Sequence, residues 1–358
     1  MSNYESEWSH CDEKIEHAGA PNPRADQATD RSGVLQAKNV KMAMAHEHMF
    51  TDFCGPDQDA YMDVNWSNKI GAAVENAEVL RGQGVNLVIE WTNIGIGRNV
   101  VALRSVSRQS EIHFVCPTGI YKDLKSPILA GVPVATMAKH FVSELATGID
   151  GTGIRAGLVK TSCNESGATR IENGILRAAA IAAKETGAAL GFHGPEAKTT
   201  RNVLKIMEKE GFNIDRFVWA HAQVSTLDDN KRLADRGVFL QYDSIGAHID
   251  QFFGGPVSDD TMLERLAQMV DGGYENQLML STDAAACINP PTLQYDRNNA
   301  YLYRYFEDKL KQRIGKHRTR KILRDNVIVA FRQPSKLLLG FIELTVKPTR
   351  RNCASSAL

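Results

Sequence analysis

The sequence lacks the features that mark several large classes of protein. No apolar run approaches the roughly 20 residues that a membrane-spanning helix requires. Lys plus Arg (42) equals Asp plus Glu (42), so the chain carries no field of one sign that would attract nucleic acid or anionic lipid. We therefore expect no membrane partner and no nucleic-acid partner. A small-molecule substrate that is neutral or modestly charged fits this composition better.

Cysteine is scarce and scattered. The six cysteines form no C-x-x-C pair, and the start of the chain has no secretory hydrophobic region. Free cysteine is among the most buried residue types, so we interpret these side chains as reduced thiols. We expect a cytoplasmic protein.

Apolar residues are also few in the first 33 positions, which are polar and include Pro21 and Pro23. A segment of this kind cannot bury enough apolar surface to fold by itself, so we expect a flexible N-terminal arm over residues 1–33. Residues 34–343 are expected to form one domain, and residues 344–358 a C-terminal tail.

Within that domain, short apolar runs alternate with longer amphipathic stretches, which is the pattern of successive β-α units. Helical spacing covers residues 171–185, 199–210 and 227–236, and a glycine suited to a left-handed helix end follows each. The strand candidates are residues 42–48, 85–90, 112–118, 154–160, 188–193, 216–221, 238–243 and 278–283.

Eight β-α units in one chain predict an α/β protein with a closed (β/α)8 barrel, the TIM barrel. An open, doubly wound sheet is the alternative architecture. No G-x-G-x-x-G motif follows the first strand candidate, so the sequence does not support nucleotide binding at that position.

Residue types that bind metals fall at the carboxyl ends of the strand candidates, where barrel active sites lie. His46 and His48 are two residues apart, so on a strand both imidazoles point to one side while Glu47 points to the other. The full set comprises His46, His48, Lys160, His193, His221 and Asp283.

A lysine in this set needs a chemical explanation, because its ammonium group would repel a divalent cation. A neutral, desolvated amine can add carbon dioxide and become a carbamate. The carbamate of Lys160 would carry a negative charge and two oxygens, which can bridge two metal ions about 3.5 to 4 Å apart. The sequence therefore predicts a dinuclear metal centre at the carboxyl ends of the strands.

These residues stand in motifs that resemble the phosphotriesterase family of the amidohydrolase superfamily, over about residues 40–335. The family also contains lactonases and amide hydrolases. The matching motifs, in chain order, are AHEHMF (45–50), EWTNIGIGRNV (90–100), CPTGIY (116–121), LVKTS (158–162), FHGPEA (192–197), WAH (219–221), QYDSIG (241–246) and LSTDA (280–284).

The resemblance implies how the ligands divide. His46, His48 and Asp283 would hold a more buried ion, and His193 and His221 a more exposed one. Carboxylated Lys160 and a bridging hydroxide would join the two ions. The resemblance also suggests a homodimer. Imidazole and carboxylate ligands suit zinc, our first expectation, and also manganese, cobalt and iron.

The sequence departs from better-known members of the family around this centre. Val224 and Ser244 stand where phosphotriesterases and lactonases usually carry an Asp and a His or Arg that relay a proton from the metal-bridging Asp. Ala284 and Ala285 replace bulkier residues that often wall the pocket. These changes leave the expected metal ligands in place and concern the substrate.

Three residues are candidates for catalysis. Asp283 can accept a proton from the attacking hydroxide and return it to the leaving group. Tyr121 matches the position where lactonase-like members place a tyrosine against the exposed metal and the substrate. His248, five residues after Asp243, could replace the missing relay or contact a substrate.

The leading hypothesis is a metal-dependent hydrolase that cleaves a carboxylic ester, lactone or amide bond of a small organic molecule. One alternative uses the same two ions as Lewis acids in a lyase or cyclase reaction. A binding protein that keeps the metals but has no turnover is another alternative, and six intact ligands argue against it.

Overall fold

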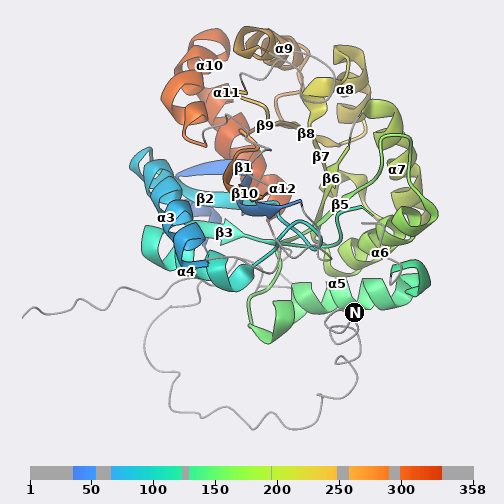
Figure 1. Ribbon diagram of the computed structural model, residues 1–358. Helices are drawn as coiled ribbons and strands as arrows, with labels where there is room; N and C mark the ends of the chain where they lie inside the picture. Colours follow the sequence, from blue (N-terminus) through green and yellow to red (C-terminus); the bar gives the residue numbers. More distant parts are fainter. Residues whose placement is uncertain are drawn as a thin grey trace, which may run out of the picture. The chain divides into compact units, whose positions relative to one another are not determined.

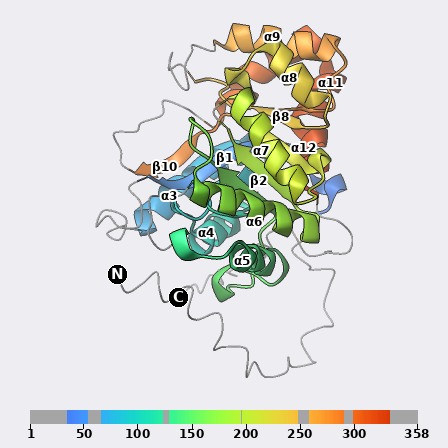
Figure 2. The same ribbon diagram turned by 90° about the vertical axis from the view of Figure 1, so that its right-hand side faces the viewer.

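The computed structural model describes residues 35–53, 66–122, 129–194, 196–247, 258–289 and 299–332. These residues all belong to one compact unit, Gly33–Leu358. In this part of the chain, parallel strands lie inside and the helices lie outside them (Figure 1). Turned by 90°, Figure 2 shows α6 and α7 running side by side along the outside. The predicted α/β class is confirmed.

The strands alternate with helices along the chain. The strands are β1 (Met42–Asp52), β2 (Val85–Glu90), β3 (His113–Val115), β4 (Pro117–Thr118), β5 (Leu158–Ser162), β6 (Ala189–His193), β7 (Phe217–Ala220), β8 (Phe239–Tyr242), β9 (Leu278–Leu280) and β10 (Ala285–Asn289). The helices are α3 (Trp66–Gly82), α4 (Val100–Ser110), α5 (Val134–Ala146), α6 (Arg170–Thr186), α7 (Ala197–Lys209), α8 (Leu227–Ala234), α9 (Asp259–Asp271), α10 (Glu307–Ile314), α11 (Lys316–Arg320) and α12 (Asn326–Phe331). Two π-helical turns, Leu302–Phe306 and Lys321–Asp325, adjoin the last helices.

The strands form two parallel sheets, in the orders β10-β1-β2-β3 and β4-β5-β6-β7-β8-β9. Only Cys116 separates β3 from β4, and only residues 281–284 separate β9 from β10. The segment between β9 and β10 also bonds to β1. The Asp283 amide donates to the His46 carbonyl at 3.2 Å, and the His48 amide donates to the Ala284 carbonyl at 2.9 Å.

Several strand boundaries differ from the predicted ones. β1 continues to Asp52, four residues beyond the predicted end at His48, so His46 and His48 lie within this strand and not at its end. The third run is divided at Cys116, whose carbonyl accepts a hydrogen bond from the Gly157 amide. The fourth strand begins at Leu158 rather than at residue 154, because Ile154 and Ala156 bond to the preceding segments around Ile149 and Glu144. β10 was not predicted, since its AACIN sequence contains a single β-branched residue, Ile288.

The helix ends follow the predicted signals closely. α6 begins with a capping box between Thr169 and Glu172, and it ends at Gly187, which has a left-handed φ of 72°. α7 and α8 end shortly before Gly211 and Gly237, which also have positive φ. The predicted helices over 171–185, 199–210 and 227–236 are therefore confirmed to within a few residues.

Alternate residues of the strands point inward and form the core together with side chains of α12. Trp91, just after β2, is fully buried at the centre of this core. Its indole N–H donates to the Ala45 carbonyl at 2.9 Å, and its ring stacks on His46 with the ring centres 4.1 Å apart. The core thus supports the strand segment that carries His46.

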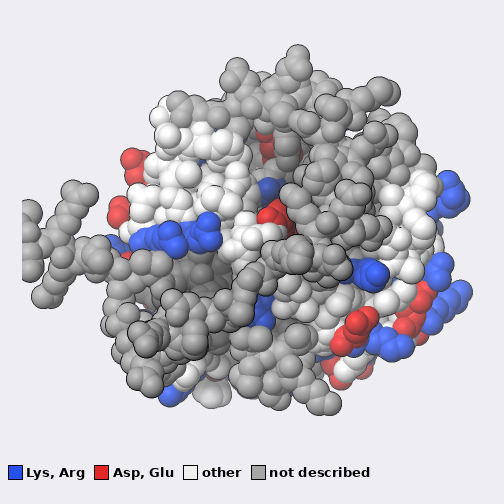
Figure 3. Space-filling view, turned by 90° about the horizontal axis from the view of Figure 1, so that it is seen from below, with Lys and Arg blue, Asp and Glu red and all other residues white. Residues whose placement is uncertain are grey.

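The surface of the described residues carries charges of both signs. On the face drawn in Figure 3, Lys and Arg side chains lie among Asp and Glu side chains, as the balanced composition leads one to expect. Among the described residues, none of the helices combines the length and apolar character needed to cross a bilayer.

The packing of Trp91 predicts the effect of two glycine substitutions. A Cβ at Gly191 would lie 2.6 Å from the Trp91 ring, so Gly191→Ala should lower the free energy of unfolding by about 1–3 kcal/mol. Gly174, inside α6, has room for a Cβ, and Gly174→Ala should be neutral or stabilising by up to about 1 kcal/mol. Denaturant unfolding measures both, and equal stability of the two variants would contradict this packing.

Candidate metal centre

The six proposed ligands lie on the central strands or on the residues that directly follow them. β1 carries His46 and His48, and β5 and β6 carry one ligand each. The other two ligands follow strands: His221 comes after β7, and Asp283 lies between β9 and β10. The side chains of His46, His48, Lys160 and His221 are buried. Those of Asp283, which is 12% exposed, and His193 are partly exposed.

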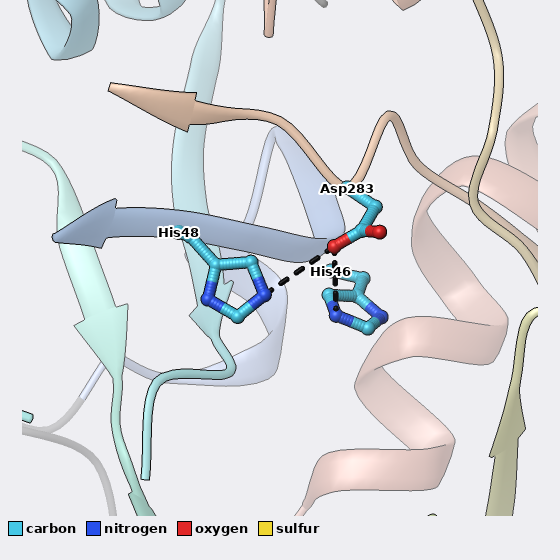
Figure 4. Close-up of side chains that lie close together, drawn as sticks. All are labelled: His46, His48 and Asp283. Carbon is cyan, nitrogen blue, oxygen red and sulfur yellow. Dashed lines mark ion pairs between the residues drawn. The ribbon is translucent and has the colours of Figure 1, made fainter. Parts of the chain in front are cut away.

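His46, His48 and Asp283 form a close group in which each residue offers one ligand atom, and these atoms lie within 4.8 Å of one another. The Nε2 atoms of His46 and His48 each lie 3.3 Å from Asp283 Oδ1 (Figure 4). Ligand atoms about 2.0 to 2.2 Å from one tetrahedral zinc ion lie roughly 3.3 to 3.6 Å apart. Both nitrogen–oxygen distances therefore match the spacing of ligands that share a single ion.

Hydrogen bonds on the far side of each imidazole leave its Nε2 without a proton. His46 Nδ1 faces the Gln241 Oε1 acceptor at 2.8 Å, and the Gln241 amide nitrogen donates to the Ala45 carbonyl, which fixes its orientation. His48 Nδ1 donates to Thr92 Oγ1 at 2.8 Å, because the Thr92 hydroxyl itself donates to a carboxylate, that of Glu90. Such partners set the tautomer of metal-binding histidines.

Burial keeps these imidazoles neutral as well. Desolvation lowers the pKa of His48 to about 3, against the opposing effect of Asp283, and it also lowers the pKa of His46. A neutral imidazole has a lone pair for a metal ion, whereas an imidazolium has none.

His193 and His221 form the second part of the centre. Their facing nitrogens, His193 Nδ1 and His221 Nε2, lie 2.7 Å apart. His221 Nδ1 donates to Asp243 Oδ1 at 2.8 Å, so the nitrogen that faces His193 has a lone pair. At 2.7 Å the two nitrogens are at hydrogen-bond distance, so in this arrangement His193 Nδ1 donates to His221 Nε2. To bind one cation together, the two nitrogens would have to lose this proton and move apart to about 3.3 to 3.6 Å.

Lys160 is almost completely buried beside this pair. Its Nζ lies 5.3 Å from the centre of the Tyr121 ring and 5.7 Å from that of Trp91. Desolvation lowers the pKa of Lys160 to about 8, although the charges of Asp283, Glu90 and Asp243 oppose this shift. A lowered pKa increases the fraction of the amine that is neutral, which is the form that adds carbon dioxide.

Two of the proposed ligands have backbone conformations that are unusual for residues other than glycine. His221 has a φ of 62° and Asp283 a φ of 49°. Conformations of this kind cost of order 1–3 kcal/mol and concentrate at functional sites, where the surrounding structure maintains them. Both residues stand at the point where the chain leaves a strand.

The other two catalytic candidates have different outcomes. The hydroxyl of Tyr121 lies 3.4 Å from His193 Nε2, so this residue borders the centre. Its ring also packs edge-on against Phe53, which is partly exposed. His248 lies outside the described residues.

The sequence interpretation gave no role to Asp243, although it ends the seventh strand candidate. Its Oδ2 lies 3.0 Å from His46 Nδ1 and its Oδ1 2.8 Å from His221 Nδ1, so it joins the two parts of the centre. Gln223 Nε2 donates to both Asp243 Oδ1 (3.0 Å) and Ser244 Oγ (2.6 Å). The region of the missing relay thus holds a network centred on Asp243. The position of Asp243 at a strand end was the signal available in the sequence.

Glu47 points away from the histidines and is fully buried. Burial raises the pKa of Glu47, and hydrogen bonds from Thr282, Ser281 and Ala284 oppose that shift because they stabilise the carboxylate.

Several known proteins are similar to this chain in sequence. A phosphotriesterase-related protein from Nematostella vectensis is 26% identical over 291 residues, 70% of this chain and 83% of the relative. An aryldialkylphosphatase from Saccharolobus solfataricus is 27% identical over 258 residues, 71% of this chain and 80% of the relative. An N-acetyltaurine hydrolase from Xenopus tropicalis is 25% identical over 225 residues, 61% of this chain and 64% of the relative.

A solved structure shares the fold. A variant of an organophosphorus hydrolase from Deinococcus radiodurans superposes with a TM-score of 0.75, at 23% identity, over 83% of this chain and 95% of that chain. Residues 27–331 match the model of the Phosphotriesterase family. This match covers most of the chain and confirms the resemblance noted in its motifs: the protein belongs to the phosphotriesterase family.

Proposed function

We propose that the chain is a hydrolase that uses two divalent cations, held at the carboxyl ends of the strands of a closed (β/α)8 barrel. The observation that carries the proposal is the shared approach of His46 Nε2 and His48 Nε2 to one oxygen of Asp283, at 3.3 Å each. Membership of the phosphotriesterase family supports it, because relatives in this comparison are hydrolases by name.

Closure of the barrel is supported at both places where the two sheets meet. β3 and β4 are successive parts of one predicted strand. On the other side, hydrogen bonds of Asp283 and Ala284 tie the segment between β9 and β10 to β1. Together these links would place every strand between two neighbours, which is the arrangement of a closed barrel.

Within that barrel, His46, His48 and Asp283 would hold the more buried ion, and His193 and His221 the more exposed one. A carbamate on Lys160 would join them. The buried, desolvated amine of Lys160 supports this assignment, because its pKa is lowered to about 8. Zinc is the first expectation for both sites, since the ligands are imidazoles and a carboxylate.

When bound, two such cations would acidify a water molecule between them and polarise the carbonyl or phosphoryl oxygen of the substrate. The protein would handle the proton. Asp283 would accept it as a general base, and its position beside His46 and His48 keeps its carboxylate at the reaction centre. Tyr121, 3.4 Å from His193, would contact the substrate where it meets the exposed site.

For the substrate we propose a carboxylic ester, lactone or amide of a small organic molecule. The relatives' names include an N-acetyltaurine hydrolase, which by name cleaves an amide, and an aryldialkylphosphatase, which acts on a phosphoester. The network of Gln223, Asp243 and Ser244 replaces the usual relay, so Asp283 would release its proton by another route than in the better-known members. A panel of esters, lactones, amides and phosphotriesters tests the substrate class directly.

The first prediction concerns metal binding. His46→Ala and His193→Ala should each lower the metal content and the hydrolytic activity together, because each removes a ligand from one of the two proposed sites. His317→Ala, at an exposed position on α11, is the control and should keep both. Elemental analysis and far-UV circular dichroism measure the outcome. Full metal occupancy in folded His46→Ala would rule out the assignment.

The second prediction concerns Lys160. Lys160→Ala should lose the dinuclear centre, and acetate or propionate in the buffer should partly restore metal binding and activity by occupying the vacated space. Lys160→Arg should not be rescued, because guanidinium keeps its positive charge and fills the space. If Lys160→Ala binds two metal ions without added acid, the bridging role is wrong.

The third prediction concerns proton transfer. Asp283→Asn should reduce kcat by at least roughly a hundredfold, as expected when a general base is lost. Steady-state kinetics at saturating metal separates this effect from weaker metal binding. Near-normal kcat in Asp283→Asn would show that another group accepts the proton.

A further inference from the structure

Glu47 lies between His46 and His48 on β1, and its side chain is fully buried on the other side of the strand. Its carboxylate lies against residues 281–284, the segment that links β9 to β10 and contains Asp283. Glu47 thus contacts the segment that carries the proposed ligand Asp283, and its neighbours in sequence, His46 and His48, are two further proposed ligands.

Both carboxylate oxygens of Glu47 accept hydrogen bonds from groups that can only donate. Oε1 accepts from the Thr282 amide at 3.0 Å, and Oε2 accepts from the Ala284 amide at 3.1 Å. These are the two peptide N–H groups on either side of Asp283. Oε2 also accepts from Asn299 Nδ2 at 2.7 Å, and the hydroxyls of Ser281 and Thr282 donate at 2.8 Å.

The backbone completes the connection. The Asp283 amide donates to the His46 carbonyl, the His48 amide donates to the Ala284 carbonyl, and the His46 amide donates to Ser281 Oγ at 2.9 Å. Asp283 itself has a φ of 49°, which a residue with a side chain rarely adopts without support from its surroundings.

We propose that Glu47 is a positioning residue: its carboxylate holds the amides of Thr282 and Ala284, and thereby keeps Asp283 turned so that Oδ1 meets His46 and His48. This role rests on the proposed function, because it matters only if Asp283 binds a metal ion. In this arrangement, the residue that orients Asp283 lies on β1, the same strand that carries His46 and His48.

Glutamine cannot replace Glu47 in this role. An amide group has one acceptor oxygen and one NH2 group, and either orientation would turn the NH2 group toward a peptide N–H, of Thr282 or of Ala284. A buried donor facing another donor loses its hydrogen bond and repels its neighbour. Glu47→Gln should therefore release the turn around Asp283.

Glu172 offers a matched control for the same chemical change. It is also fully buried, and it also accepts two backbone N–H groups, of Asn164 and Thr169. Both bonds go to Oε2, and Oε1 has no hydrogen-bond partner among the described residues. The amide of Glu172→Gln can therefore keep both bonds, and this variant should bind metal like the wild type.

The experiment is a titration of the metal-free full-length chain with Co²⁺, followed by its visible absorption spectrum and by circular dichroism. Glu47→Gln should weaken the tighter Co²⁺ site by roughly 10- to 100-fold, the usual cost of losing a residue that orients a ligand. Its Co²⁺ spectrum should also change in shape, because Asp283 leaves the coordination sphere. Glu172→Gln should reproduce the wild-type affinity and spectrum.

Three outcomes would overturn the proposal. The first is wild-type affinity and spectrum in Glu47→Gln. The second is a weaker affinity of Glu47→Gln with an unchanged spectrum, which would indicate a purely electrostatic effect, and the third is an equal loss of affinity in Glu172→Gln. If Glu47→Gln does not fold, Thr282→Val removes one hydroxyl donor to Glu47 and should weaken the site by roughly two- to tenfold. Wild-type affinity in Thr282→Val would then overturn the proposal. A wild-type chain that binds no Co²⁺ would instead contradict the proposed function itself.

Discussion

The pairing of β1 with the segment between β9 and β10 is the constraint on which the rest of the centre depends. Backbone hydrogen bonds join His46 of β1 to Asp283 and His48 of β1 to Ala284 in the segment between β9 and β10. Neither element alone could form the site, because β1 supplies only imidazole nitrogens and the segment between β9 and β10 supplies only the carboxylate of Asp283. Their register brings an oxygen of Asp283 within 3.3 Å of both imidazoles, and Trp91 supports the strand from the core side.

Burial then determines the chemistry of these groups. An interior that excludes water favours neutral imidazoles and a neutral amine, so the pKa values of His48 and Lys160 fall to about 3 and about 8. Many buried polar groups at one place would be costly without partners. The carboxylate of Asp243 is a partner for one ring nitrogen each of His46 and His221. Bound cations would be the partners of the Nε2 atoms of these two residues.

The sequence predicted the positions of the proposed metal ligands better than those of the residues that orient them. Strand ends can be read from short apolar runs and from the glycines that end helices, and Lys160, His193, His221 and Asp283 stand at or near such ends. His46 and His48 lie inside β1, which continues to Asp52. The partners of Glu47 and Asp243 are far away in sequence, so no local period reveals them. The late start of β5 has the same origin, because the carbonyl of Glu144 and the amide of Ile149 bond to residues 154–156 and keep them out of the strand.

The central claim is that these ligands hold two cations, and a crystal structure of the metal-loaded protein with anomalous scattering measured at the metal edge tests it most directly. The account predicts two peaks about 3.5 to 4 Å apart. One should lie about 2.0 to 2.2 Å from His46 Nε2, His48 Nε2 and Asp283 Oδ1, and the other equally close to His193 Nδ1 and His221 Nε2, with a carbamate on Lys160 between them. Peaks away from these atoms, or a free Lys160 amine in an otherwise occupied site, would contradict it.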